Sequence, residues 1–515
     1  MTLNTSAGDL LAAADYESQT TFTTDVLIIG TGAGGAAAGA ELAEAGREVT
    51  FLEEGSYLPT SSMSLYARDS VPRLYRDGGA TVIMGTPQIP YIEGRCVGGT
   101  TVINGGMTYR PPDRILEEWH EITGDATLGA DGMCELFDRV EDRICASLQH
   151  EASVGEDNRL MAQGARKLGW KYEVNRRNQD TCVGANSCVF GCPTGAKQST
   201  LVSYMPRAMS AGATCLTELR VVKLLIEGGR CAGAIARVVN QRTRRLGKRI
   251  TVRANDTIVA CGAVQTPLLL KRHRLGKPSK QLGKNFLCHP NAKVMALYPG
   301  AINAWQGVSQ WSQVREFMDE GILFAENMIP PAAVGARMPF HGTEAWEVMS
   351  KYNHLSTTGV LVEDSTTGTV HRAPTGVPLI RYDITKYDHE RFIRGVKLLS
   401  TLHFEMGAER VILPFSNFTE AHSVDDLNRI DPLRQTKQTL DLFTVHLMGT
   451  ARMGSDPRTS VVNLDGQLWD LPNCYIADAS LFPTAVGVNP QVTIMALATR
   501  VAHRLAAKKS SVAAA

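Results

Sequence analysis

The chain has 515 residues, 43% of them apolar and 20% charged, and its formal net charge is +1. This composition is typical of a folded globular protein, and the length suits two domains better than one. A near-neutral charge lacks the basic surplus that nucleic-acid or anionic-membrane binding needs, so we expect neither partner. The longest charge-free apolar window, Val26–Ala40, is too short to span a bilayer, and no transmembrane segment is predicted. Eleven cysteines, an odd number, argue against a disulfide framework and favour a reducing, cytoplasmic setting.

The first predicted elements form a βαβ unit. Thr24–Ile29 is predicted as a buried strand and Gly30–Gly35 as a tight turn. Ala36–Ala45 follows as a helix, and Val49–Leu52 as a second strand. This order is typical of the opening of a doubly wound parallel sheet.

The turn has the glycine spacing of a dinucleotide-binding loop. Gly30 permits the turn, Gly32 lets the backbone approach a pyrophosphate, and Gly35 lets the helix pack on the strand. The start of the helix adds amide donors and partial positive charge for phosphates. Glu53, at the end of the second strand, is placed to accept from a ribose hydroxyl pair. We therefore expect dinucleotide binding; the alternative is that these glycines serve packing alone.

The later elements are less regular. In chain order they are a glycine cluster at Gly94–Gly106, helices at Ile115–Gln149 and Asn158–Leu168, and strands at Val221–Ile226, Ala232–Val239 and Thr251–Ala260. From about Asn303 to Thr439 the composition changes, because tryptophans, prolines and alternating β-like stretches replace the glycine turns. The last eighty or so residues return to strand, glycine turn and helix.

Five further stretches, in order, resemble the glucose–methanol–choline (GMC) family of FAD-dependent oxidoreductases. They are Gly94–Gly105, Gly262–Leu270, Gly283–Pro290, Asp478–Thr484 and Asn489–Thr493. The resemblance extends from Asp25 to about Leu505 and is weakest between Asn303 and Thr439. The stretch Gly195–Thr200 is most similar to long-chain alcohol oxidases of this family.

The resemblance implies tightly bound FAD in place of a diffusing NAD. With the glycine turn, it implies that the cofactor lies against Gly30, Gly32, Ala33, Gly34, Gly35, Glu53, Glu54, Arg95, Gly98, Gly99, Thr100, Asn104, Gly105, Val221, Cys261, Gly262, Asp478, Ala479, Asn489, Pro490, Gln491 and Thr493. Some members attach FAD covalently through a histidine near the first signature. Positions 94–101 contain no histidine, so we expect non-covalent FAD.

The expected fold is α/β, with a Rossmann-like FAD-binding domain interleaved with an antiparallel-sheet (α+β) substrate domain. The FAD-binding domain is predicted to comprise residues 22–130, 200–300 and 440–510. Residues 131–199 form a helical and cysteine-rich connecting segment, and residues 301–439 form the substrate-binding domain.

His446 is the candidate base, because its surroundings are similar to the family's H-x-x-G-T-x-x-M-G block. An alcohol releases a hydride with difficulty while it keeps its proton, and a neutral imidazole near pH 7 is the natural acceptor for that proton. The alternative is a buried histidine at a strand end, satisfied by backbone groups.

Asn489 is the candidate partner of His446. It precedes Pro490 and a helical pattern, so it could serve simply as an N-cap. Many family members have a second histidine here, whereas choline- and cholesterol-oxidising members have asparagine. The resemblance implies that the Asn489 amide orients the substrate hydroxyl, which leaves His446 as the only titratable base of the pair.

Three cysteines, Cys182, Cys188 and Cys192, have the spacing C-x5-C-x3-C. Thiolates at such spacing can hold an iron–sulfur cluster, and the stretch resembles that of bacterial FAD glucose dehydrogenases. The oxidase-like stretch Gly195–Thr200 that follows favours a loop without metal. The third possibility is that free cysteines simply pack well in a glycine-rich loop.

The leading hypothesis is therefore FAD-dependent oxidation of an apolar alcohol (long-chain, aromatic or polycyclic) to an aldehyde or ketone. Its expected partners are the small-molecule alcohol and oxygen or another electron acceptor. The first alternative is a sugar dehydrogenase that passes electrons through an iron–sulfur cluster to a partner protein. The second is a lyase that keeps FAD without using its redox chemistry.

Overall fold

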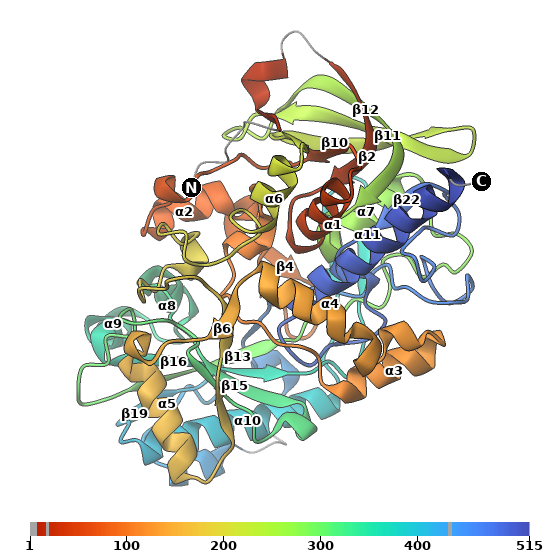
Figure 1. Cartoon of the computed structure of the whole chain (residues 1–515). Coiled ribbons are helices and arrows are strands. Elements are labelled where there is room, and N and C mark those ends of the chain that lie inside the picture. Colours follow the sequence, from red (N-terminus) through yellow and green to blue (C-terminus); the bar gives the residue numbers. More distant parts are fainter. Residues whose placement is uncertain (1–7, 17–19, 431–434, 514–515) are drawn as a thin grey trace.

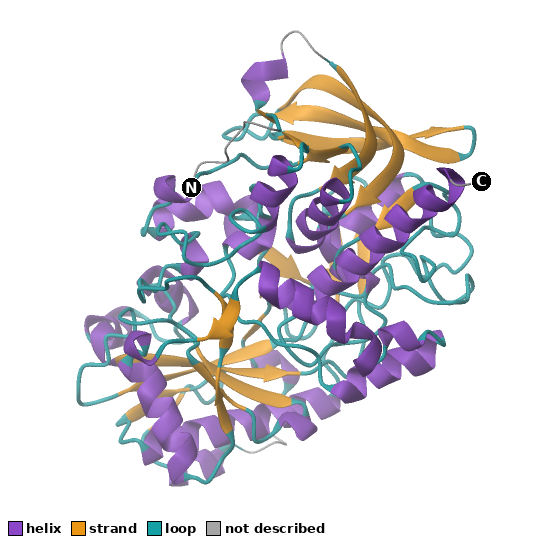
Figure 2. Ribbon diagram, viewed as in Figure 1, coloured by secondary structure: helices purple, strands orange, loops and turns teal. Residues whose placement is uncertain are grey.

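The structure is a computed structural model that describes residues 8–16, 20–430 and 435–513. Most strands belong to two large sheets, one in the upper and one in the lower part of Figure 1. Helices cover both sheets (Figure 2). The expected α/β fold with a second, antiparallel sheet is confirmed.

The first sheet has the strand order β1-β9-β3-β2-β12-β11-β10, with β22 beside β12. Its strands are β1 (Leu10–Leu11), β2 (Thr21–Ile29), β3 (Val49–Leu52), β9 (Thr214–Leu216), β10 (Leu219–Glu227), β11 (Arg230–Val239), β12 (Leu246–Val259) and β22 (Cys474–Ile476). Strands β2, β3, β9, β12 and β22 run parallel, whereas β10, β11 and β12 pair antiparallel. The predicted βαβ unit lies at the centre, and its strands read as apolar runs because both faces are covered.

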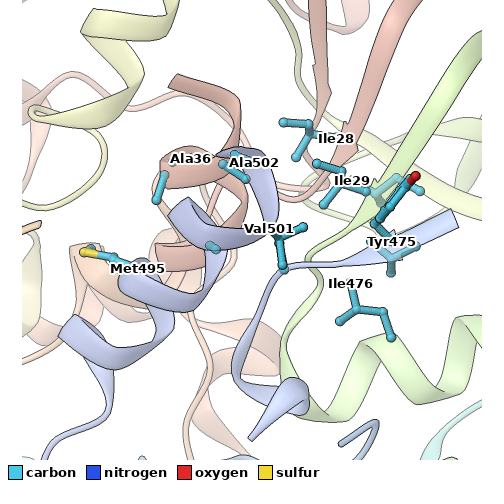
Figure 3. Packing of buried hydrophobic residues seen from close by; sticks show 14 of the residues in the cluster. Ile28, Ile29, Ala36, Tyr475, Ile476, Met495, Val501 and Ala502 are labelled. Atoms are coloured by element: carbon cyan, nitrogen blue, oxygen red, sulfur yellow. The ribbon is translucent and has the colours of Figure 1, made fainter. Parts of the chain in front are cut away.

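Two helices pack against the centre of this sheet. Helices α1 (Ala33–Glu44) and α11 (Gln491–Ala513) contact each other, and Ala36, Ala502, Val501 and Ile28 belong to one buried cluster (Figure 3). Small residues on both helices let their axes approach. As a result, helices from opposite ends of the chain share one core with β2.

The second sheet has the order β20-β19-β13-β16-β15-β14-β7, with β21 beside β13, and every pair is antiparallel. Its strands are β7 (Tyr172–Val174), β13 (Asn291–Leu297), β14 (Ser312–Val314), β15 (Ile322–Glu326), β16 (Leu355–Val362), β19 (Arg410–Ile412), β20 (Glu420–Ala421) and β21 (Leu442–Phe443). Helices α5 (Glu156–Lys167) and α10 (Lys386–Glu405) cover one face with apolar side chains. The opposite face is the one that matters for the site.

Three strands of the second sheet lie outside residues 301–439. Strand β13 falls in the predicted 200–300 segment, β21 in the 440–510 segment and β7 in the connecting segment. Whether a strand belongs to a sheet depends on its pairing with distant segments, and a change in composition along the chain does not reveal such pairing. The division into domains stays a prediction.

The remaining elements surround the two sheets. They are helices α2 (Ala67–Leu74), α3 (Asp113–Thr123), α4 (Ala130–Arg143), α6 (Tyr204–Ser210), α7 (Gly262–Arg272), α8 (Pro331–Arg337) and α9 (Gly342–Ser350), and strand pairs β4 (Thr81–Ile83) with β5 (Ile89–Tyr91), β6 (Ala146–Leu148) with β8 (Arg176–Asn178), and β17 (Thr369–Arg372) with β18 (Pro378–Arg381). The helix-like stretch expected at Ile115–Gln149 holds two helices: Gly124, at φ 71°, ends α3, and α4 starts six residues later. Within the described ranges, no helix combines the length and apolar character needed to cross a membrane.

Candidate active site

The glycine turn connects β2 to α1 at the carboxyl edge of the first sheet. Gly30 has φ 103°, which favours glycine, and its amide donates to the Leu52 carbonyl at 2.8 Å. A Cβ at Gly34 would overlap the carbonyl oxygen of Ala477, so this position needs glycine for close packing. A Cβ at Gly32 would meet nothing within 4 Å. The backbone at Gly32 therefore faces open space at the start of a helix, where an anionic group fits.

The sequence-predicted cofactor segments converge on this turn. The Gly98 amide donates to Thr31 Oγ1 at 3.0 Å, and a Cβ at Gly99 would lie 2.9 Å from the Cα of Gly32. On the other side, the Gly262 amide donates to Asp478 Oδ2 at 2.9 Å. Segments that are hundreds of residues apart thus meet at the N-terminus of α1.

Two of the predicted cofactor carboxylates are engaged by the protein's own donors. Asp478 also accepts from Thr266 Oγ1 at 2.5 Å and from the Ser480 amide at 2.8 Å, while burial raises the pKa of its carboxyl. Glu54 forms ion pairs with Arg76 at 3.2 Å and Arg220 at 2.5 Å. These contacts tie neighbouring segments together, so the side chains of Asp478 and Glu54 have structural roles around the turn.

Glu53 lies buried beside the turn. Its Oε2 accepts from the amide and hydroxyl of Thr31 at 3.1 and 2.7 Å, and its Oε1 accepts from the Gly55 amide at 2.8 Å. A carboxylate offers about four acceptor sites, so capacity remains for a ribose hydroxyl. Val221 lies on β10, and that strand begins where the Leu219 amide donates to the Glu53 carbonyl at 2.8 Å.

Buried donors without partners test whether these residues fit FAD. Arg95 is 2% exposed, and its Nε and Nη1 find no acceptor among the described residues. Within the same described residues, Gln491 Nε2 and Thr493 Oγ1 at the start of α11 are also unpartnered. An uncompensated buried guanidinium is costly, and an anionic pyrophosphate supplies what it lacks. The amide of Asn104 donates to the Gln491 side chain, which joins the first signature to α11. The residues present fit a dinucleotide.

His446 and Asn489 meet at the start of α11. The amide nitrogen of Asn489 lies 3.2 Å from Nε2 of His446. His446 Nδ1 and Asn489 Oδ1 have no partner in the part of the chain that the structure describes. The Asn489 side chain is thus directed at His446 and not at the first amides of the helix, as a capping side chain would be. Both partners have unused hydrogen-bonding capacity.

Burial controls the charge of His446. The loss of hydration, together with the nearby His289, lowers the pKa of His446 to about 3. The imidazole is therefore neutral at pH 7 and has a lone pair that can accept a proton. Thr444 fixes the backbone here: its Oγ1 accepts from the His446 amide at 3.2 Å and donates to the Cys288 carbonyl.

Sequence reasoning missed a second buried histidine. The ring of His289 lies perpendicular to that of His446, with ring centres 5.7 Å apart. Its Nε2 accepts from the Gly487 amide at 3.3 Å, two residues before Asn489. Asp364 accepts from the backbone amides of Cys288 and His289 at 3.0 and 2.8 Å. The sequence signal that could have identified this histidine was its position inside the family-like stretch Gly283–Pro290.

The three cysteines do not gather at one point. Cys188 Sγ accepts from Arg177 at 3.1 Å, and Cys192 Sγ accepts from the Lys197 amide at 3.3 Å. Cys182 packs in a small apolar cluster with Val308 and other residues. Across residues 8–16, 20–430 and 435–513, no group of three His, Cys, Asp or Glu side chains could hold a metal ion. All eleven cysteines are free thiols.

Lys197 gives the oxidase-like stretch after the cysteines a structural role. Its buried ammonium donates to the carbonyls of Val102, Asn104 and Cys188 at 2.7, 2.8 and 2.6 Å. One side chain thereby fastens the cysteine loop to the first signature. Burial lowers the pKa of Lys197 to about 8.

The fold and the convergence of these segments define an FAD-binding oxidoreductase. Comparison with known families agrees: models described as GMC oxidoreductase match residues 71–291 and 364–498, and one described as FAD binding domain matches residues 25–65. An uncharacterized GMC-type oxidoreductase of Sinorhizobium fredii is 33% identical over 93% of this chain and 94% of its own length. The chain belongs to the GMC oxidoreductase family, and its cofactor is FAD.

Two other similar proteins show how far the likeness extends. A long-chain-alcohol oxidase of Arabidopsis thaliana is 26% identical over 94% of this chain and 66% of its own length. Among solved structures, pyridoxine 4-oxidase of Mesorbium loti superposes with a TM-score of 0.72 at 17% identity, covering 93% of this chain and 99% of that one. At that identity the second likeness concerns the fold alone.

We predict that the FAD is held without a covalent bond. No histidine lies in Gly94–Thr101, and the glycine turn and the Arg95 guanidinium supply non-covalent contacts. Acid precipitation of the purified protein should release the yellow chromophore into the supernatant. Flavin that stays with the denatured pellet, and with its peptides after proteolysis, would contradict this expectation.

Proposed function

We propose that this oxidoreductase converts an alcohol to an aldehyde or ketone, with His446 as base and Asn489 as the group that orients the substrate. The observation that carries the proposal is the 3.2 Å contact between the two side chains at the start of α11. A neutral imidazole and a carboxamide meet there, which suits removal of one proton from a hydroxyl.

Each side chain has a distinct task. The substrate hydroxyl donates its proton to Nε2 of His446, and its oxygen accepts a hydrogen bond from the Asn489 amide. Burial keeps the imidazole free of a proton before the substrate arrives. When bound, FAD supplies the acceptor for the hydride that leaves the carbinol carbon. The His289 ring packs against the His446 ring. Thr444 accepts a hydrogen bond from the His446 amide and donates one to the Cys288 carbonyl. These contacts hold the His446 ring and backbone in position.

The class of alcohol is also part of the proposal. Similarity to a long-chain-alcohol oxidase supports a substrate with an apolar body, and the second electron acceptor is oxygen or another oxidant. We keep the expected cytoplasmic setting, which the eleven free thiols support. The cluster-containing sugar dehydrogenase is not proposed, since Cys182, Cys188 and Cys192 point to separate partners.

A panel of alcohols mixed with the FAD-loaded protein without oxygen tests the proposal. At least one alcohol should bleach the visible absorbance of the flavin, and admission of an oxidant should restore it. A lyase would consume a substrate and leave the flavin colour unchanged. If no straight-chain, aromatic or polycyclic alcohol bleaches the flavin, including alcohols that carry a carboxylate, the proposed function is wrong.

A further inference from the structure

A row of buried side chains crosses the face of the second sheet that is turned away from α5 and α10. Lys293 of β13 is opposite Gly359 of β16, Gly359 is opposite Ala325 of β15, and Ala325 is opposite Gln313 of β14. Residues directly opposite each other in antiparallel strands point to the same side. A lysine and a glutamine therefore flank two small residues on one face, away from α5 and α10.

Lys293 lacks the partner that a buried ammonium needs. It is 9% exposed, and its Nζ makes no hydrogen bond or ion pair to any described residue. Its nearest aromatic group is Phe443, with Nζ 4.7 Å from the ring centre. A cation over a ring stabilises the ammonium by less than its desolvation costs. Burial accordingly lowers the pKa of Lys293 to about 7, although Glu326 opposes that shift.

Neighbouring polar atoms on this face are unsatisfied too. Asn291 Oδ1, Gln313 Oε1 and Gln310 Oε1 are buried, and no hydrogen-bond partner for them exists in the described ranges. A Cβ at Gly359 would lie 2.7 Å from Lys293 Nζ, so the absent side chain makes room for the amine. These three atoms are acceptors and do not by themselves favour an anion; the unpartnered buried donor beside them is Nζ of Lys293, and that donor is the group that selects the ligand.

Both ends of the row are joined to the catalytic pair. At one end, Phe443 pairs with Asn291 across β21 and β13 and lies three residues before His446. At the other end, Gln313 Nε2 donates to Met107 Sδ at 3.1 Å, and Met107 packs against Val488, the residue before Asn489. The row thus adjoins the two segments that carry His446 and Asn489.

We propose that the alcohol oxidised at His446 carries a carboxylate group, and that Lys293 binds this carboxylate. The inference rests on the proposed function, and it narrows the substrate class from simple alcohols to hydroxy acids. The single charge of one lysine matches a carboxylate. A phosphate dianion would bring one more negative charge than the single ammonium can balance. An apolar chain between hydroxyl and carboxylate would lie over Gly359 and Ala325, which have no side chains large enough to obstruct it.

Binding of simple carboxylates tests this assignment without turnover. FAD-loaded protein is titrated with straight-chain monocarboxylates from butanoate to decanoate, and with the alcohols of the same lengths, while flavin absorbance and the melting temperature are followed. The wild type should bind at least one carboxylate more tightly than the matched alcohol. In Lys293→Met that carboxylate should bind roughly 10–100-fold more weakly, as expected for a lost charge-assisted hydrogen bond. Alcohol binding should change little.

Two further variants complete the design. Lys386→Met removes an exposed charge, since that side chain is 88% exposed, and should behave like wild type. Lys293→Gln keeps a polar side chain for the case in which Lys293→Met does not fold, and should lose the same preference. Inorganic phosphate and an alkyl phosphate form the second arm of the titration, and tighter binding than the carboxylates would overturn the choice of carboxylate.

Failure of the inference can be told apart from failure of the proposed function. If alcohols bleach the flavin but no carboxylate binds, or Lys293→Met binds carboxylates as tightly as wild type, the role of Lys293 is wrong and alcohol oxidation stands. If carboxylates bind through Lys293 but neither alcohols nor hydroxy acids bleach the flavin, the proposed oxidation is wrong.

Discussion

Replacing His446 with alanine is expected to lower the rate of flavin reduction by about 10²–10⁴-fold, the usual effect of removing a positioned base. The FAD should remain bound, because the contacts of His446 are with Asn489, His289 and Thr444 and not with the glycine turn. Rapid mixing with the best alcohol in the absence of oxygen measures the rate directly, and the absorbance ratio of flavin to protein measures occupancy.

The control for this variant is His120→Ala, which removes a surface histidine that is 43% exposed. It should reduce flavin at the wild-type rate.

Because burial lowers the pKa of His446 to about 3, protonation of His446 should not slow flavin reduction by the wild type between about pH 8 and pH 5. A His446→Ala enzyme that reduces its flavin nearly as fast as wild type would exclude His446 as the base.

Replacing Gly32 with alanine is expected to abolish most FAD binding while the protein stays folded. The backbone there has φ −67°, which alanine adopts readily, and the added methyl meets no protein atom within 4 Å. The cost to the fold is at most about 1 kcal/mol at this N-cap position. The methyl instead occupies the approach to the first amides of α1, where the pyrophosphate is expected. The flavin content after purification, and unfolding of the apoprotein in urea, measure the two effects separately.

Gly34→Ala is the matched comparison, since the same methyl is added two residues later. There it overlaps the Ala477 carbonyl, so the apoprotein itself should lose about 1–3 kcal/mol of stability. Full FAD occupancy in Gly32→Ala would contradict the position of the cofactor. Unchanged stability in Gly34→Ala would contradict the close packing of α1 on the segment before Asp478.

Local pattern predicted the first βαβ unit well. Apolar runs, glycine spacing and the strand after Gly46 all act over a few residues, so β2, α1 and β3 lie within three residues of their expected bounds. The helix-like stretch Ile115–Gln149 is divided between α3 and α4, because the left-handed conformation of Gly124 ends the first helix. Membership of β13 in the second sheet depends on strands 60 to 120 residues away, which no local pattern reports.

The site was predictable where a motif carried it and not where packing alone did. His446 and Asn489 were found from motifs, and the structure brings them into contact. His289 gains its place through Asp364, which is 75 residues further along the chain. Lys293 follows no motif: its interest lies in the absence of a partner among the described residues, a property that appears only after folding.

Glu54 stands beside Glu53 at the end of β3 but makes different contacts. Its place at the cofactor stays a prediction. Alternate residues at a strand end point to different sides. In the structure Glu54 forms ion pairs with Arg76 and Arg220, whereas Glu53 accepts a hydrogen bond from Thr31 in the glycine turn.

The proposed oxidation removes a hydride from the carbon that bears the hydroxyl. The most direct measurement uses the best primary alcohol with both hydrogens of that carbon replaced by deuterium, mixed with the FAD-loaded protein without oxygen. We expect one aldehyde per flavin bleached, each aldehyde retaining one deuterium, and slower bleaching than with the unlabelled alcohol. Product that retains both deuteriums, or product that forms while the flavin keeps its colour, would contradict the account.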